Sequence, residues 1–400
     1  MTINTGQPAH PRQAVAVNPT LLTAILCVCG IGVVSQLYIP IPLIGFISER
    51  YGVTGDQAAL AGSLFGFPYA AAFLFFGPWS DQVGRRFVLV LGFSLLAISS
   101  LLVAFAPGFS TMLLARAVQG FCAASFSPVA LAYVADATEA KARAMSVALL
   151  TTSLFLAGIL GQVYASAMAL HFGWEALFAT TTVFYVAAAL IIRFALPAIT
   201  PSGGASSFRK IYAAIPGLLT QRRLLAVYLV SFLVLLGFVA FYSGLGPYLS
   251  QRFGVAPTEM IWVRAAGLPA MFAAIVVGRL LPRLGGPFFL MAGLIVAAIG
   301  FALAAVPGPL AWTVCASVVF VLGTSLMIPS MMFRINELAA TGRGAAAALY
   351  TLTLFAGASV GVLIGQWAVP MGFTGFSLFM AVLYLAGLIG FRWLNGGREH

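Results

Sequence analysis

Two copies of one apolar pattern fill this chain, and that repetition limits the folds open to it. Runs of about 20 or more apolar residues alternate with short polar or Gly/Pro-marked breaks. Residues of the first half return at an offset of 201, so that Gly66, Pro68, Gly77, Gly84 and Gly92 are matched by Gly267, Pro269, Gly278, Gly285 and Gly293. Such registration indicates a tandem duplication, and two parallel copies of a membrane bundle meet at a seam that can hold a small molecule.

Composition places the chain in the membrane. Of the 400 residues, 62% are hydrophobic and only 7% are charged, which is more apolar surface than a soluble domain can bury. A membrane-spanning helix needs roughly 20 apolar residues. We expect twelve, at 20–47, 57–76, 87–106, 110–135, 145–170, 175–197, 224–250, 260–281, 287–306, 310–335, 344–369 and 374–394. The expected fold is an all-α membrane protein with twelve transmembrane helices in two pseudo-symmetric six-helix bundles.

The breaks between runs also predict the domain boundaries. We expect an N-terminal tail at 1–19, a first bundle at 20–197, a linker at 198–222, a second bundle at 223–394 and a C-terminal tail at 395–400. Within the linker, Phe208, Ile211, Tyr212 and Ile215 recur at helical spacing with basic residues between them. This pattern predicts a short helix that lies on the membrane surface.

The basic residues predict the orientation. Sixteen of the 20 Lys and Arg lie in or beside alternate breaks; Arg50 and Arg252 lie in the other breaks, and Arg116 and Arg264 lie within helices. Because basic residues stay on the cytoplasmic side, we expect both termini in the cytoplasm, an uncleaved first helix and an inner-membrane location. The net charge of +11 then reflects topology, so we expect no nucleic-acid partner.

The sequence lacks the arrangement of reactive residues that an enzyme or a metal site requires. Two of the three histidines lie near the chain ends, and all four cysteines lie within apolar runs. A G-x-S-x-G string at 357–361 lies in the middle of an expected helix, where a nucleophile elbow cannot form, and small residues there favour close helix packing. We expect no catalytic residue, no metal site and no cofactor.

The break between the second and third expected helices, residues 77–86, reads GPWSDQVGRR. It resembles the G-x-L-a-D-r-x-G-R-[RK] loop signature of the major facilitator superfamily, with Gly77, Asp81, Gly84, Arg85 and Arg86 in register. The helix count, the internal repeat and the expected orientation extend the resemblance over the whole chain. In that family the loop aspartate helps to lock the two halves together in the outward-facing state, which the resemblance implies for Asp81.

The second copy of this loop keeps its glycines but has Pro282 in place of the aspartate, so we do not expect it to act as the same latch. The family resemblance further implies a gate of carboxylates and arginines at the cytoplasmic helix ends. The residues assigned to it, besides the first loop, are Asp136, Arg143, Arg283, Glu337 and Arg343. The alternative for the carboxylates is that they are solvated helix-end charges.

Two further motifs resemble the 12-helix drug:proton antiporter branch, which includes sugar and drug exporters. Residues 37–43, LYIPIPL, resemble its P-x-[LI]-P element, and residues 116–120, RAVQG, resemble its R-x-x-Q-G element. A third motif departs, because residues 157–164 lack the proline of the antiporter element G-x-x-x-G-P-x-x-G-G. The resemblance therefore implies a transporter and leaves the direction of transport open.

Arg116 is the most informative single residue. It lies about nine residues inside the outer end of its helix, roughly 13 Å, too deep to reach the membrane interface easily. Burying a charge there costs at least ~2.5 kcal/mol, so we expect Arg116 to bind substrate or to hydrogen-bond the first or second helix. Arg264 lies about five residues from an outer end, so a substrate role and a side chain reaching to the interface are both open.

None of the nine acidic residues lies in a helix interior. Proton-coupled exporters of cationic drugs commonly hold such an acid in the cavity, so we expect a neutral or anionic small-molecule substrate. Side chains that would line its pocket, with simple packing as the alternative for each, are Gln36, Tyr69, Gln119, Phe155, Tyr242 and Tyr350.

The predicted function is secondary active transport by alternating access, with proton-coupled efflux of a small organic solute as the first hypothesis. The alternatives are uptake of an organic anion or metallophore and, remotely, a membrane enzyme or sensor. The expected partners are the substrate, protons and the lipid bilayer, and the expected state is a monomer.

Overall fold

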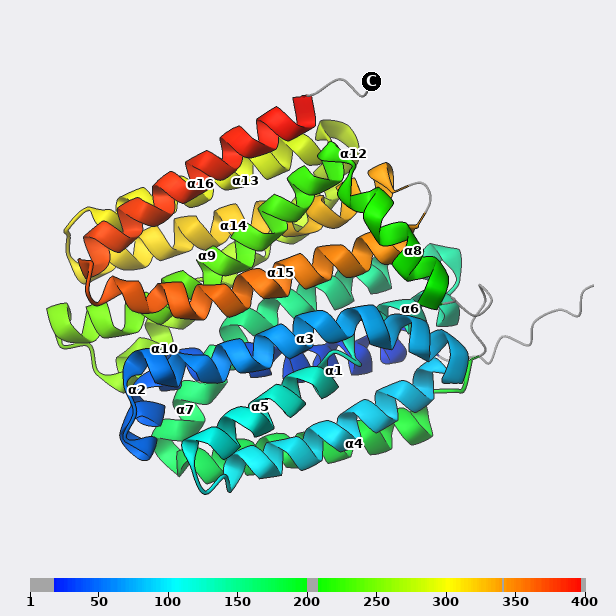
Figure 1. Ribbon diagram of the computed structural model, residues 1–400, viewed down its shortest axis with the longest axis horizontal. Helices are drawn as coiled ribbons and strands as arrows, with labels where there is room; N and C mark the ends of the chain where they lie inside the picture. Colours follow the sequence, from blue (N-terminus) through cyan, green and yellow to red (C-terminus); the bar gives the residue numbers. More distant parts are fainter. Residues whose placement is uncertain (1–17, 200–207, 340–341, 397–400) are drawn as a thin grey trace, which may run out of the picture.

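The computed structural model describes residues 18–199, 208–339 and 342–396, and within these ranges it contains helices and no strand. The first helix, α1 (Pro19–Tyr38), begins at the same end of the molecule at which the last, α16 (Gly372–Gly396), finishes (Figure 1). We call this end the terminal face and the opposite end the distal face.

The helices follow the order of the expected repeat (Figure 1). After α1, the first half contains α2 (Pro40–Tyr51), α3 (Gly55–Val83), α4 (Arg85–Ala104), α5 (Phe109–Ala123), α6 (Ser127–Ala137) and α7 (Ala140–Ala195). A connecting helix, α8 (Phe208–Leu219), leads to the second half. That half contains α9 (Arg222–Phe253), α10 (Pro257–Ala265), α11 (Leu268–Met271), α12 (Ala273–Leu284), α13 (Gly286–Ala305), α14 (Leu310–Leu338), α15 (Arg343–Gly365), the short η1 (Gln366–Ala368) and α16.

Eleven helical segments of the described chain are long and apolar enough to cross a membrane. One of them, Met145–Ala195, has 51 residues, more than twice the roughly 20 that one crossing needs. It turns back at Gly173, whose φ of 82° is not helical. The segment therefore crosses twice, and the all-α architecture with twelve spans is confirmed.

Three of the expected spans are broken within the membrane. The first divides into α1 and α2 at Pro40, the fourth into α5 and α6 just before Pro128, and the eighth into α10, α11 and α12 around Pro269. Each proline stands in the first turn of the helix that follows the break, where its missing N–H is not needed. The cap residues at these breaks keep right-handed helical backbone angles, so each break interrupts the helix only locally.

Glycine packing brings helices of each half together. A Cβ at Gly357 or Gly361 would collide with the backbone of α9, and a Cβ at Gly120 would collide with the carbonyl of Phe65 on α3. The interpretation of the 357–361 string as a helix-packing element is therefore confirmed.

Turns at the terminal face use positive backbone angles. Gly84 ends α3 at φ 98° and its repeat partner Gly285 ends α12 at φ 79°. Only glycine adopts such angles without strain, so both copies of the loop make a tight turn at this point.

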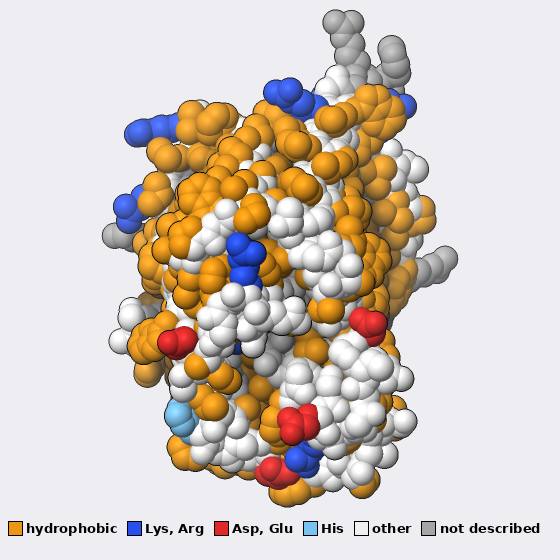
Figure 2. All heavy atoms as spheres, turned by 90° about the vertical axis from the view of Figure 1, so that its left-hand side faces the viewer, with side chains coloured by type: hydrophobic (Ala, Val, Ile, Leu, Met, Phe, Trp, Pro, Cys, Tyr) orange, Lys and Arg blue, Asp and Glu red, His pale blue; other side chains and the backbone are white. Residues whose placement is uncertain are grey.

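The flank of the molecule is apolar, as a lipid-facing surface requires. Large side chains such as Leu114, Phe194 and Ile389 are exposed, and Trp262 and Trp393 are exposed near the distal and terminal ends. Figure 2 looks onto the distal face, where few charged side chains lie among uncharged ones. In the linker, α8 forms where a short helix is predicted and Tyr212 on it is exposed, whereas the side chains of 208–211 lie outside the described set.

Candidate functional site

A cavity of about 500 Å³ lies at the seam between the two halves. Its walls come from α1, α3, α4, α6 and α7 of the first half and from α9, α14 and α15 of the second. Asp81, Arg85 and Gly344 line it at helix ends of the terminal face, so the cavity reaches that face.

Aromatic rings fill the seam on the distal side of the cavity. Phe355 of α15 lies edge-on to Tyr69 of α3, with ring centroids 4.5 Å apart, and stacks on Phe73 at 5.5 Å. Tyr38 of α1 meets Phe238 of α9 edge-on at 5.8 Å. Because these ring pairs join the two halves, the seam is closed on the distal side of the cavity, whereas the cavity is open toward the terminal face.

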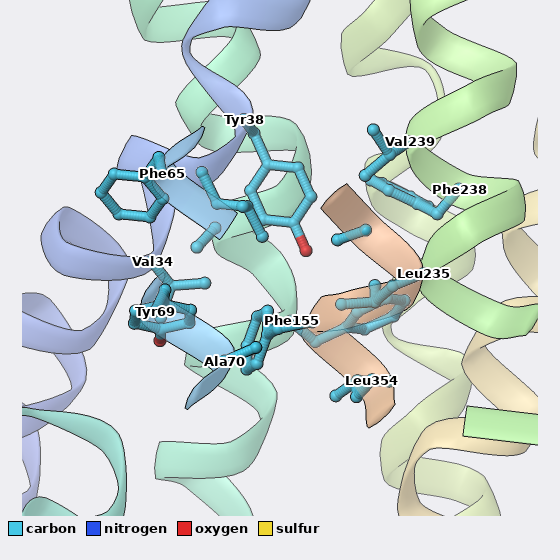
Figure 3. Close-up of a cluster of buried hydrophobic side chains, with 14 of the residues drawn as sticks. Val34, Tyr38, Phe65, Tyr69, Ala70, Phe155, Leu235, Phe238, Val239 and Leu354 are labelled. Carbon is cyan, nitrogen blue, oxygen red and sulfur yellow. The ribbon is translucent and has the colours of Figure 1, made fainter. Parts of the chain in front are cut away.

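Two tyrosine hydroxyls are available inside the cavity. Tyr38 and Tyr350 both line it, and neither hydroxyl has a hydrogen-bond partner among the described residues. In Figure 3 the hydroxyl of Tyr38 points toward the gap between the helices that carry Phe155 and Leu235. The hydroxyls of Ser127 and Thr151, which also line the cavity, already have hydrogen-bond partners. Ser127 Oγ lies 3.3 Å from the Tyr69 hydroxyl, and Thr151 donates to the Val147 carbonyl.

An ion-pair cluster lies at the mouth of the cavity. Arg85 Nε lies 2.7 Å from Asp136 Oδ2, and Arg85 Nη2 lies 3.1 Å from Asp81 Oδ1. All three side chains are largely buried. This cluster joins the end of α3 and the start of α4 to the end of α6 within the first half. The lock between the two halves that the family resemblance implies for Asp81 is not formed by these contacts and stays a prediction.

The second half has no equivalent cluster among its described residues. Glu337 pairs with Arg334, one turn earlier on the same helix, at 3.0 Å. Arg283 is exposed and forms no ion pair with a described carboxylate. In this structure, therefore, the assigned gate residues Glu337 and Arg283 do not meet, and the side chain of Arg343 lies outside the described set.

The remaining loop residues have separate contacts. Arg86 Nη1 donates to the Leu196 carbonyl at 3.0 Å, and Arg143, which is exposed, donates to the Thr138 carbonyl at 3.2 Å. Gly77 lines the cavity, and a Cβ built on it meets no atom within 4 Å. The close helix contact expected of Gly77 is thus absent in this state.

Arg116 does not line the cavity. It is 1% exposed, its Nε donates to the Ala61 carbonyl of α3, and its Nη2 donates to the Gln36 carbonyl of α1. Its Nη1 donates to the side chains of Gln36 and Gln119, and Gln119 donates onward to Ser100. This geometry is the structural alternative weighed for Arg116, a cross-link of α5 to the first two spans.

The other predicted pocket residues divide into two groups. Phe155 and Tyr350 line the cavity, whereas Gln36, Tyr69, Gln119 and Tyr242 are fully buried outside its wall. Arg264 is only 5% exposed and donates to Ser166 of α7 across the seam, so the interpretation that it reaches to the membrane interface is wrong. Tyr38 was missed as a cavity residue, although its position directly before the Ile39–Pro40 break was a usable signal.

Two helical bundles around one seam cavity are the architecture of a membrane carrier, and comparison with known proteins specifies which kind. The chain belongs to the Major Facilitator Superfamily, whose family model matches residues 25–361. The resemblance of the loop at 77–86 to that family is thereby confirmed. The family and the relatives below are transporters, which sets aside the membrane-enzyme alternative.

The relatives agree on the class and differ in what their names say. YybF of Bacillus subtilis (strain 168), an uncharacterized MFS-type transporter, is 25% identical over 373 residues, covering 90% of this chain and 91% of that protein. The multidrug resistance protein MdtL of Klebsiella pneumoniae is 30% identical over 156 residues, 39% of this chain and 40% of its own. A bacterial homolog to the human lysosomal transporter Spinster, solved in an inward-facing and unoccupied conformation, superposes with a TM-score of 0.70 at 14% identity, covering 94% of this chain and 95% of that one.

Proposed function

We propose that this transporter moves a small, neutral, largely apolar organic solute, and that the seam cavity is its binding site. The observation that supports this is the cavity wall, which combines apolar side chains of both repeats with the free hydroxyls of Tyr38 and Tyr350. Aromatic and aliphatic walls bind by apolar contact, and two hydroxyls fix the orientation of a ligand that carries hydrogen-bonding groups.

The charges around the cavity favour a neutral solute. The carboxylate in its wall is Asp81, which lies at the mouth and is paired with Arg85, so a cation finds no free acid deeper in the described wall. Arg116 is turned away from the cavity, so an organic anion finds no free cation deep in this wall either. Of the two substrate classes expected from the sequence, neutral and anionic, the charges around this cavity favour the neutral one.

Alternating access supplies the mechanism. The helices of 20–197 and 223–394 act as two bodies that rock about the cavity, with α8 as the connection at the terminal face. In this proposal the terminal face is on the cytoplasmic side of a bacterial inner membrane, because most of the described basic helix ends are on that face. In this orientation the structure is the cytoplasm-open state.

Efflux coupled to proton return is the direction we propose. The resemblance of the motifs at 37–43 and 116–120 to drug exporters supports it, as does the similarity of part of the chain to a multidrug resistance protein. The groups that could carry the proton are the helix-end carboxylates Asp56, Asp136, Glu259 and Glu337, since the described spans carry no acid in their interiors.

Everted membrane vesicles test the proposal. Cells that make the protein should yield vesicles that accumulate a neutral aromatic drug when a proton gradient is imposed, and collapse of the gradient should stop accumulation. Uptake of an organic anion is the second candidate, favoured by the buried Arg264 near the distal face. Accumulation of an organic acid by right-side-out vesicles, with none of a neutral drug by everted ones, would replace export with uptake.

A further inference from the structure

A buried arginine lies in the closed part of the seam, near the distal face and away from the cavity. Arg264 follows the first two turns of α10, is 5% exposed, and donates from Nη1 to Ser166 Oγ of α7 at 2.9 Å. Since Ser166 belongs to the first half and Arg264 to the second, this hydrogen bond exists only while the two halves touch here.

The charge of Arg264 has no counter-ion in this state. Among the described residues, none of the ion pairs includes it, and the one hydrogen bond found for its five N–H donors goes to a neutral hydroxyl. A buried cation without an anion is costly in a membrane protein unless protein oxygens satisfy its donors, as they do for Arg116. Where they do not, such residues mark substrate or ion paths.

A second polar group is buried beside it without a partner. Tyr242 of α9 is 0% exposed, and its hydroxyl has no hydrogen-bond partner within the described structure. That hydroxyl lies against Gly267, three residues after Arg264, and a Cβ on Gly246, one turn beyond Tyr242, would lie 3.4 Å from Arg264 Nη2. The faces of α9 and α10 that carry these two groups are therefore opposed.

We propose that Arg264 and Tyr242 form a binding site for a carboxylate anion, which opens when α7 and α10 separate. The inference rests on the proposed alternating access and extends it with a charged ligand class. With the distal end closed, the Ser166 hydroxyl accepts a hydrogen bond from the Arg264 guanidinium. With the distal end open, a carboxylate replaces Ser166, since the planar fork of arginine matches its two oxygens and the tyrosine hydroxyl adds a third donor.

The site couples ligand to conformation. A carboxylate that binds only the distal-open state shifts the population toward that state. Ser166 competes with the ligand, so removal of its hydroxyl should strengthen anion binding. A purely structural arginine predicts no such gain, because loss of the Ser166 hydroxyl would then weaken closure without giving the anion a place to bind.

Equilibrium binding of radiolabelled benzoate to the full-length protein in detergent tests the site, with benzamide as the uncharged probe of the same shape. We expect benzoate to bind, Arg264→Gln to weaken it roughly tenfold or more, and Ser166→Ala to strengthen it by about tenfold. Arg264→Lys, which keeps the charge and loses the fork, should fall between the native protein and Arg264→Gln. A gain in affinity cannot come from misfolding, so Ser166→Ala remains decisive even if the arginine variants are unstable.

A second measurement follows the opening itself. Val362 of α15 is 0% exposed against Gly62 of α3, in the distal part of the seam. A Val362→Cys variant in which the four native cysteines are replaced should react faster with an impermeant maleimide when benzoate is present, and no faster with benzamide. The acceleration should disappear with Arg264→Gln.

The proposal is overturned if benzoate does not bind, if Arg264→Gln binds it as well as the native protein does, or if Ser166→Ala binds it less tightly. Transport of a neutral drug by the unaltered protein is measured separately in vesicles. If the neutral drug is transported but benzoate does not bind, the anion site alone is overturned. If the neutral drug is not transported, the proposed cargo is contradicted. Benzoate binding needs no turnover, so it decides the anion site in either case.

Discussion

Each nitrogen of the Arg116 guanidinium donates to an oxygen of the protein. Three of its four hydrogen bonds link α5 to α1 and α3, and the fourth goes to Gln119 on α5 itself. The guanidinium also lies 4.4 Å from the centroid of the Phe65 ring. Two of the acceptors are backbone carbonyls beside the helix break at Pro40 and the distal half of α3. A charge this deep is stabilised because its donors are nearly all satisfied, and its role here is to hold three helices in register.

Arg116→Lys tests that role. A lysine ammonium cannot reach these acceptors in a planar arrangement, and each buried acceptor left unpaired costs roughly 1–3 kcal/mol. The purified variant should therefore unfold at a lower temperature than the native protein. Arg143→Lys, at an exposed position with one backbone contact, serves as the control and should unfold with the native protein. An unchanged transition for Arg116→Lys would contradict the structural role.

Tyr38→Phe tests the cavity. It removes one hydroxyl that has no partner in the described protein and leaves the ring, so stability should change little. A substrate that accepts or donates one hydrogen bond there loses about 0.5–1.5 kcal/mol, which is roughly a two- to twelvefold rise in Kd. Tyr51→Phe, near the distal face and away from the cavity, is the control for binding; its hydroxyl donates to the Ala106 carbonyl at 3.5 Å and does not line the cavity. Equal affinity in both variants would remove Tyr38 from the site.

Sequence reasoning identified the depth of these residues better than their direction. Position along a helix gives the distance from the membrane surface, and Arg116, Gln119 and Gln36 lie buried at the depth that it indicates. Direction depends on how each helix is rotated and bent in the bundle, which the sequence pattern does not specify. Hence the sequence leaves both a substrate role and a structural role open for Arg116, and it does not single out Tyr38, whose hydroxyl faces the cavity.

Among the elements, α3 and α15 define the shape of the seam. Near the distal face they touch, since Ser63 Oγ of α3 donates to the Ser359 carbonyl of α15 at 2.7 Å. Near the terminal face they diverge, because a Cβ on Gly77 of α3 or on Gly344 of α15 meets nothing within 4 Å. Both glycines line the cavity mouth, so closing the terminal end would bring their surroundings together.

Gly77→Leu should trap the terminal-open state. The added side chain fits the open mouth and would obstruct the contact that closes it. We expect substrate binding in detergent to persist and transport in proteoliposomes to fall at least tenfold. The control is Gly278→Leu at the repeat position, where a Cβ is equally free but the residue does not line the cavity. Normal transport by Gly77→Leu would show that closure does not use this surface.

The spans were predictable as elements, whereas most of their breaks were not. Apolar length determines where the chain crosses the bilayer, and every expected crossing is present. Pro40, Pro128 and Pro269 break their helices, but Pro68 and Pro329 lie inside intact ones, so proline alone does not locate a bend. The sequence pattern does not separate these two groups of prolines.

At the scale of the whole molecule, the two repeats share a fold but not a charge pattern. The terminal end of the first half carries the Asp81–Arg85–Asp136 cluster, whereas the second copy of the loop has Pro282. In this terminal-open structure the cluster is confined to the first half among the described residues. The family resemblance implies that Asp81 engages the other half in the opposite state, so the repeats contribute unequally to gating.

Asp81→Asn should therefore lower turnover more than substrate affinity, and Pro282→Asp should change neither strongly. The neutral amide keeps the shape of the side chain and loses the charge that pairs with Arg85. Binding in detergent and transport in liposomes, measured on the same preparation, separate the two effects. Equal loss of binding and transport in Asp81→Asn would place Asp81 in substrate recognition instead of gating.

The charge of the cavity sets the last prediction, which concerns substrate class. Since the described wall carries no free carboxylate, cells that make this transporter should gain no protection from ethidium and similar lipophilic cations. Thr151, half-buried in the wall on α7, offers a position at which to add one. An acid near a bound cation attracts it by up to about 4 kcal/mol at 4 Å for an effective dielectric of ~20, so Thr151→Glu should confer ethidium transport, with an affinity gain of about tenfold or more after desolvation. Thr151→Gln, whose side chain has the size of glutamate without the charge, should not confer ethidium transport. Ethidium resistance from the unaltered protein would show that cations are recognised without a cavity acid and would contradict the proposed neutral cargo.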